Sequence, residues 1–201
     1  MSPRAIHLGL PPLAILLTSN QRQIGKATVA IRACEDLGLH AFPIDSFDIL
    51  TDGGAGGGDV KTEEYLRRRA ERGLSCGAEY TTLILKHVDA LNADRMATAL
   101  KEILADSRVL IATTTEVDKV PDGIRALFTH EMEMSAPDEG EREGILRGIV
   151  EDAGIRLAPD VDLSSVAVKT AALVAGDLVD VVERAIAVSY THLTLPTNRE
   201  V

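Results

Sequence analysis

The stretch that decides the fold is LLTSNQRQIGKATVA, residues 16 to 30. It begins inside an apolar run, LAILLTS, of the kind that forms a buried strand. After the loop, small and apolar residues recur at helical spacing before Gly38: Ala27, Ala30, Ile31, Cys34 and Leu37. This order predicts a strand, a loop and a helix that Gly38 closes. A phosphate-binding loop requires that context.

The loop matches part of the pattern G-x-x-x-x-G-K-[ST], in which backbone N–H groups surround phosphates, the lysine reaches the terminal ones and the hydroxyl binds Mg²⁺. Gly25 and Lys26 are present, but Asn20 replaces the first glycine and Ala27 replaces the hydroxyl residue. Thr28 follows one residue late, and one helical step turns a side chain by about 100°, so it should point away from a metal. The candidate nucleotide-binding residues of the loop are Asn20, Gly25, Lys26 and Thr28.

Composition limits the class of protein. The 201 residues suffice for one α/β domain, or for one domain with a small appendage. A net charge of −10, with 3% aromatic residues, argues against binding to nucleic acid or to anionic membranes. The longest apolar stretch is too short to span a bilayer, so we expect a soluble, intracellular chain. Cys34 and Cys76 are expected to be buried free thiols.

Strand and helix patterns alternate along the first two thirds of the chain. Further strands are expected at residues 40–45, 80–86, 107–115 and 130–134, with helices at 61–73 and 93–105 and a glycine-rich loop at 46–60. Such alternation predicts an α/β fold with a mostly parallel sheet. Because ligands bind at the carboxyl ends of parallel strands, the Lys26 loop, Lys86–His87 and Thr113–Thr115 should meet.

After Met134 the sequence no longer alternates between strand and helix patterns, and only helical patterns follow. Residues 135–154 open with Ser135, carry acids in the first turn and predict a helix, and shorter helices are expected at 163–172 and 176–188. The sequence thus predicts an α/β domain over residues 1–134 and a truncated helical lid over 135–188. The last thirteen residues, SYTHLTLPTNREV, resemble a translated cloning tail and are set apart as non-native and disordered; the alternative is a natural, poorly ordered terminus.

An α/β phosphate-loop core followed by a helical lid resembles an AAA-type ATPase module. The block IATTTEVDKVPDGIRALFTHEMEMSAPDEGEREGIL looks like the second half of that module, and AGDL, residues 175–178, looks like its lid motif Gly-Ala-Asp-Leu. More closely, ILLTSNQRQIGKATVA, GGDVKTEEYL, LFTHEMEM and KTAALVAGDLVDVVERA resemble the first, degenerate AAA module of the fungal peroxin-6 family, which acts in peroxisome biogenesis. The resemblance covers about residues 5 to 188.

Several positions depart from that family pattern. An AAA Walker B strand ends in Asp-Glu, which order the metal and polarise water, but TLILKHVDAL has Lys86 and His87 there. We expect His87 to be a structural histidine at a strand end and Asp89 to be a solvated or salt-bridged loop residue. Thr115 takes the sensor position of asparagine. Arg125 is expected to lie on a helix surface and not to act as an arginine finger, and the segment 53–58, which matches the substrate-gripping pore loop, lacks an aromatic residue.

The resemblance implies ATP as the ligand, held without hydrolysis and possibly without Mg²⁺, with Lys86 supplying part of the metal's charge. It also implies a hetero-hexameric ring with a peroxin-1-like AAA partner, which extracts the peroxisomal import receptor. Attachment to a peroxisomal membrane anchor would run through regions outside this chain, so the chain would be cytoplasmic, peripheral to that membrane and not inserted in it. Two alternatives remain open. One is an adaptor domain without nucleotide, and the other is an ATPase whose rearranged site uses Thr28 and His87.

Overall fold

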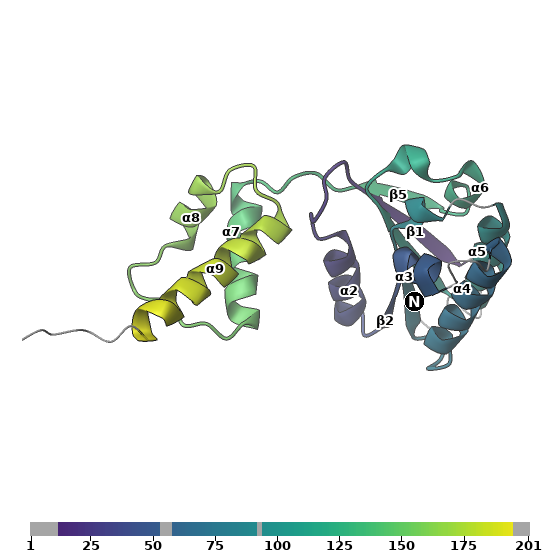
Figure 1. The fold of residues 1–201 in the computed structure, drawn as a ribbon, viewed down its shortest axis with the longest axis horizontal. Coiled ribbons are helices and arrows are strands. Elements are labelled where there is room, and N and C mark those ends of the chain that lie inside the picture. Colours follow the sequence, from purple (N-terminus) through teal and green to yellow (C-terminus); the bar gives the residue numbers. More distant parts are fainter. Residues whose placement is uncertain (1–11, 53–57, 92–93, 195–201) are drawn as a thin grey trace, which may run out of the picture. The chain divides into compact units, whose positions relative to one another are not determined.

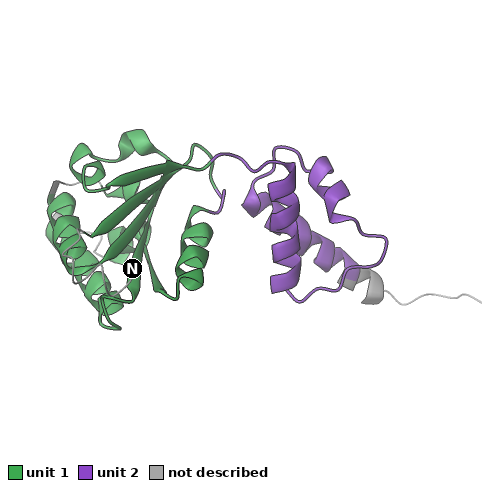
Figure 2. Ribbon diagram, turned by 180° about the vertical axis from the view of Figure 1, so that it is seen from behind, with its two compact units in different colours: residues 1–22, 26–134 green, residues 23–25, 135–201 purple. Residues whose placement is uncertain are grey.

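The computed structural model describes residues 12–52, 58–91 and 94–194, and the chain forms two compact units (Figures 1 and 2). The first unit runs to Met134. The second begins at Ser135 and also takes in the loop residues Gln23–Gly25, which appear as a separate purple segment in Figure 2. The predictions for residues 53–57 and 195–201, in the glycine-rich loop and the tail, lie outside the described residues.

The first unit is built on a five-stranded sheet in which every pairing is parallel. Its order is β2-β3-β4-β1-β5. The strands are β1 (Leu13–Thr18), β2 (His40–Asp45), β3 (Thr81–Lys86), β4 (Val109–Thr114) and β5 (His130–Glu133). β4 is buried at every position and β3 at all but its last, which is why both read as continuous apolar or β-branched runs. The predicted parallel α/β fold is confirmed.

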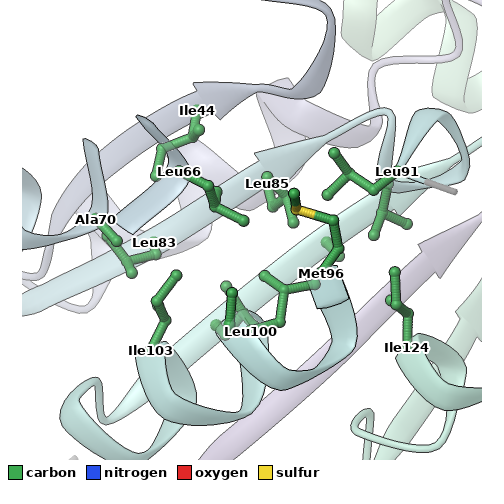
Figure 3. Packing of buried hydrophobic residues seen from close by; sticks show 14 of the residues in the cluster. Ile44, Leu66, Ala70, Leu83, Leu85, Leu91, Met96, Leu100, Ile103 and Ile124 are labelled. Carbon is green, nitrogen blue, oxygen red and sulfur yellow. The ribbon is translucent and has the colours of Figure 1, made fainter. Parts of the chain in front are cut away.

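Helices cover both faces of the sheet. They are α2 (Lys26–Asp36), α3 (Ser46–Asp52), α4 (Gly58–Leu74), α5 (Asp94–Asp106) and the short α6 (Asp122–Arg125), with 3-10 turns η1 (Val88–Ala90) and η2 (Val117–Lys119). Ala30 and Cys34 of α2 pack on one face of the sheet, in a cluster with Ile84 and Ile111. The other face carries the larger cluster under α4 and α5, which Figure 3 shows around Leu85, Met96 and Leu100.

Three features of the first unit differ from the sequence expectation. Residues 46–52 form the helix α3, where the glycines that follow led us to expect a loop. Leu37 is 73% exposed and not on the inner face of α2, because that helix ends at Asp36 and Leu37 lies in the turn before Gly38. Cys34 is a buried free thiol as predicted, whereas Cys76 is exposed because it lies in the turn after α4.

The second unit is helical and contains α7 (Glu139–Asp152), α8 (Leu163–Lys169) and α9 (Ala175–Thr194). Leu146, Ala167 and Leu178, one from each helix, form its buried centre. The cap of α7 is Asp138, not Ser135 as expected: Asp138 accepts from the Glu141 amide, and the Glu141 carboxylate accepts from the Asp138 amide.

The last helix differs from the expectation for the chain's end. α9 continues to Thr194, past the predicted end at residue 188, so six residues of the supposed tail are helical. Whether residues 189–201 are native stays a prediction. In the described part of the chain, no helix combines the length and apolar character that a bilayer crossing requires.

Candidate functional site

The site lies at the carboxyl ends of three neighbouring strands. β4 lies between β1 and β3, and its pairing places Thr114 opposite Thr18, the last residue of β1. On its other side, Ala112 lies opposite Leu85, one residue before the end of β3. The phosphate loop, the end of β3 and the end of β4 therefore leave the sheet at one edge, as the sequence predicted.

The phosphate loop connects β1 to α2, and Lys26 is the first residue of that helix. Gly25 has a backbone φ of 93°, a conformation that residues other than glycine rarely adopt. This explains why the motif has a glycine here. Lys26 is only 9% exposed, and its Nζ donates a hydrogen bond of 3.2 Å to the carbonyl of Gln21. The lysine thus folds back across its own loop, where phosphate oxygens would meet it.

The charge at the loop is set by few groups. Burial lowers the pKa of the Lys26 ammonium, and the field of the Asp89 carboxylate raises it. The first turn of α2 contains no acidic residue, so no carboxylate there opposes an anion at the helix N-terminus. The Lys26 ammonium, partly removed from water at the start of a helix, is in an electrostatic environment that suits phosphate.

The other two loop candidates differ from Lys26 in their exposure to solvent. Asn20 and Thr28 are both exposed. The buried hydroxyl of Ser19, which the motif does not include, accepts from the Gln21 amide at 3.2 Å and so shapes the first turn of the loop. The role of Ser19 depends on the backbone conformation of this turn, which the phosphate-loop motif does not specify. The motif therefore could not identify Ser19.

Lys86 ends β3 and is half-buried. Side chains alternate along a strand, and Ile84, two residues earlier, packs in the cluster beneath α2. Lys86 therefore lies on the face of the sheet that α2 covers. The helix α2 begins with Lys26. The resemblance places a metal-ordering aspartate where Lys86 stands.

His87 turns away from the loop. Its backbone is left-handed (φ 55°, ψ 49°), and its ring lies 4.8 Å from the ring of Phe47 in α3. Its Nε2 faces Asp45 Oδ2 at 3.9 Å. These neighbours come from β2 and α3, so the His87 ring lies beside the elements next to β3. The expectation of a structural histidine agrees with these contacts.

The last residue of β4 is Thr114, one residue before Thr115, whose match to the sensor position stays a prediction. Thr114 is 1% exposed, and its Oγ1 donates a 2.6 Å hydrogen bond to Asp89 Oδ1. Asp89, which the sequence predicts to be a solvated or salt-bridged loop residue, is half-buried, and its partner is a hydroxyl. Three consecutive threonines were the available signal, but the residue at which β4 ends decides which one faces Asp89.

Arg125 is engaged within the first unit. It forms a bidentate ion pair with Glu131 of β5, with hydrogen bonds of 2.8 to 3.0 Å from Nε and Nη2. Both side chains are partly exposed. This contact accounts for Arg125 as a surface residue of α6, as expected. That it is not an arginine finger stays a prediction.

The tip of the phosphate loop packs within the second unit, to which Gln23–Gly25 belong. The amide of Gly176, in the first turn of α9, donates a 2.9 Å hydrogen bond to the carbonyl of Gln23. A Cβ at Gly176 would lie 2.7 Å from the Gln23 Cβ, so no side chain fits there. Asp177 of the lid motif accepts from the Val174 amide at 3.1 Å and caps α9.

These features define a class of protein. A parallel sheet in the order β2-β3-β4-β1-β5, with a glycine–lysine loop between β1 and α2, forms an α/β domain of the AAA phosphate-loop type. No family model matches the sequence. Comparison with curated proteins finds fungal relatives that are described as the peroxisomal ATPase PEX6.

The chain is 66% identical over 185 residues to the peroxisomal ATPase PEX6 of Colletotrichum orbiculare, a match that covers 92% of this chain. It is 66% identical to PEX6 of Penicillium chrysogenum and 60% identical to PEX6 of Arthrobotrys oligospora, each over 184 residues. The chain therefore belongs to the PEX6 family of peroxisomal ATPases, and its resemblance to that family is confirmed. It matches one segment of each relative. It spans 13% of the length of the Colletotrichum relative and 16% of the Arthrobotrys relative.

Proposed function

We propose that this segment is a nucleotide-holding module that binds ATP through its phosphate loop and does not hydrolyse it. The observation that carries the proposal is the contrast within one site. Lys26 is buried at the loop and hydrogen-bonded to the Gln21 carbonyl, while a second lysine, Lys86, ends the strand where a metal-ordering acid would stand.

Binding is supported by the phosphate-facing groups. The Gly25 backbone, the start of α2 and the Lys26 ammonium provide donors and positive charge of the kind that phosphates require. Lys86 adds a second positive charge on the face of the sheet that α2 covers. Asn20 and Thr28 remain candidates for outer contacts to the nucleotide, since both are exposed beside the loop.

The donor set of the site does not suit Mg²⁺. The metal prefers carboxylate and hydroxyl oxygens, whereas Lys86 and Ala27 occupy the corresponding positions. We therefore propose that ATP is held with lysine charge in place of part of the metal's charge.

Magnitudes support the absence of turnover. Loss of a positioned base costs about 10²- to 10⁴-fold in rate, and loss of an arginine finger costs about 10³- to 10⁵-fold. His87 faces Asp45 and Phe47, and Arg125 is paired with Glu131, so neither is free for these roles. Even with strong non-additivity, such losses remove several kcal/mol of transition-state stabilisation, at about 1.4 kcal/mol per factor of ten.

For the complete protein we propose the role that the resemblance implies. This module would stabilise a hetero-hexameric ring, formed with a peroxin-1-like AAA partner, while another module hydrolyses ATP to extract the peroxisomal import receptor. The ring would be cytoplasmic and attached to the peroxisomal membrane through an anchor bound by other regions. The high identity to peroxisomal ATPases supports this proposal.

Equilibrium binding of a fluorescent ATP analogue tests the proposal. The titration is run on the chain with Mg²⁺ and with a chelator, and is repeated on Lys26→Ala. We expect binding that tolerates the chelator and is lost in the variant. Binding that requires Mg²⁺ would contradict the metal-independent site. An absence of binding in both media would favour the adaptor domain without nucleotide.

A further inference from the structure

The turn that opens the phosphate loop is held by a buried hydroxyl that lies outside the motif. Ser19 follows β1, which lies between β4 and β5 in the sheet. It is 4% exposed, and the carbonyl of Thr18, just before it, accepts a 2.8 Å hydrogen bond from the Met134 amide. The Ser19 Oγ accepts from the Gln21 amide at 3.2 Å. The sheet therefore holds the hydroxyl in place, and the hydroxyl holds the backbone of Gln21.

Gln21 also holds the lysine of the loop. Its carbonyl accepts a 3.2 Å hydrogen bond from Lys26 Nζ. The amide and the carbonyl of Gln21 belong to the two peptide planes that meet at its Cα atom, and few combinations of φ and ψ are allowed there. A hydrogen bond to the amide therefore limits the direction in which the carbonyl points. Ser19, Gln21 and Lys26 all belong to the first unit, so this pair of hydrogen bonds lies within one compact body.

The turn at Asn20 is made without a glycine, although Asn20 occupies the position of the motif's first glycine. Among the described residues, those other than glycine with a positive φ are Gln23, His87 and Ala172. Asn20 therefore does not use the left-handed backbone that glycine favours. A serine hydroxyl that accepts from the amide two residues later forms a local turn that needs no glycine. The hydrogen bond of Ser19 thus supports the turn where the motif relies on glycine.

We infer that Ser19 is a positioning residue for Lys26 and that, through Gln21, it holds the ammonium where the phosphates of a nucleotide would meet it. The inference rests on the proposed function, because it assumes that the loop receives phosphates. An ammonium has three N–H donors, so the hydrogen bond to the Gln21 carbonyl leaves two for phosphate oxygens. A lysine side chain loses much conformational entropy when it is ordered, and one that is already held loses less on binding. Ser19 therefore raises the affinity for nucleotide without touching it.

NMR relaxation of the Lys26 side chain, in the chain without nucleotide, tests the positioning directly. The Lys26 Cε signal is identified by its loss in Lys26→Ala. We expect an ordered side chain in the unmodified chain and a mobile one in Ser19→Ala, with order regained in Ser19→Thr, which keeps the hydroxyl. Ser107→Ala is the matched control. Ser107 is 0% exposed, its Oγ has no hydrogen-bond partner among the described residues, and it precedes β4, at the opposite end of the sheet from the loop.

The variants define what would overturn the inference. A Lys26 side chain as ordered in Ser19→Ala as in the unmodified chain would show that the hydroxyl does not hold it. A lysine that becomes mobile in Ser107→Ala as well would also overturn the inference, because the loss of any buried hydroxyl would then have the same effect. A lysine that stays mobile in Ser19→Thr would do so too, because the hydroxyl would not be the group that acts.

Binding of the ATP analogue in chelator separates this inference from the proposed function. We expect the affinity of Ser19→Ala to be about two- to tenfold lower than that of Ser107→Ala, the range for the loss of one hydrogen bond, and Ser19→Thr to bind as the unmodified chain does. An unchanged affinity in Ser19→Ala would overturn the positioning role while leaving nucleotide binding intact. No binding by the unmodified chain, together with a lysine that becomes mobile in Ser19→Ala, would instead overturn the proposed function and leave Ser19 as the residue that orders Lys26.

Discussion

The phosphate loop and the end of β3 show opposite chemistry in one site. At the loop, Gly25 has the backbone that the motif needs and Lys26 is buried at the start of α2. At the end of β3, a lysine replaces the metal-ordering acid of the AAA pattern, and His87 turns its ring to Phe47 and Asp45. Under the proposed function, holding a nucleotide and hydrolysing it depend on separate residues: the chain has the glycine and lysine of the loop and lacks the acids at the end of β3.

The largest effect should come from the loop. Lys26→Ala removes the charge that would contact the phosphates, and a hydrogen bond to a charged group contributes about 1.5–3 kcal/mol. We expect ATP affinity to fall by about 100-fold, at about 1.4 kcal/mol per factor of ten. Fluorescent-analogue titration measures this, and Lys101→Ala, on the exposed side of α5, is the matched control. Equal affinities in the two variants would show that the loop does not hold the nucleotide.

The next effect concerns the tip of the loop in the second unit. Gly176→Ala would place a Cβ 2.7 Å from the Gln23 Cβ, and such overpacking costs about 1–3 kcal/mol. We expect the variant to unfold at lower denaturant concentration. Gly148→Ala in α7 is the control, since its Cβ meets nothing within 4 Å and alanine favours a helix by about 0.5–1 kcal/mol. A Gly176→Ala variant as stable as the control would contradict the close packing of Gln23 and Gly176.

A smaller effect is expected at the end of β3. Lys86→Ala should weaken ATP binding about tenfold in chelator, since one partly solvated charge contributes about 1.4 kcal/mol or less. Lys86→Asp restores an acid at the metal-ordering position and should make binding depend on Mg²⁺. The two variants are titrated with and without Mg²⁺ beside the unmodified chain. If both bind ATP as the unmodified chain does, Lys86 has no part in the site.

The smallest effect should be at Arg125. Its ion pair with Glu131 is partly exposed, and exposed pairs contribute about 0.2–1 kcal/mol. We expect Arg125→Ala to lower the free energy of unfolding by that amount and to leave ATP binding unchanged. A double-mutant cycle with Glu131→Ala isolates the pair. A large loss of ATP affinity in Arg125→Ala would place this residue in the nucleotide site and remove the proposed distinction between the two regions.

Much of the fold could be predicted from the sequence. Buried parallel strands produce continuous apolar runs, and β3 and β4 lie where those runs predicted them. Helical spacing correctly predicted the buried residues of α4 and α5, such as Leu66 and Leu100. The helix α3 was missed because its seven residues are followed by a glycine-rich stretch. The cap of α7 was misplaced because Ser135 and Asp138 are both good capping residues, and only the structure distinguishes them.

The site was predictable only where a linear motif specifies it. Gly25 and Lys26 were assigned from the spacing of the motif, and Lys86 from the resemblance to AAA modules. Their part in nucleotide binding stays a prediction. The contact between Thr114 and Asp89 joins residues that are 25 positions apart, and the turn of His87 depends on Phe47 from another element. Such contacts depend on how strands align and where they end, and these properties are set by the packed sheet.

One measurement tests the central claim most directly. The chain is incubated with radiolabelled ATP in Mg²⁺, the bound nucleotide is recovered from the protein, and its identity is determined, with Lys26→Ala in parallel. We predict that intact ATP is recovered from the unmodified chain and that little is recovered from the variant. Formation of ADP by the unmodified chain, abolished by Lys26→Ala, would contradict the claim that this segment holds its nucleotide without hydrolysing it.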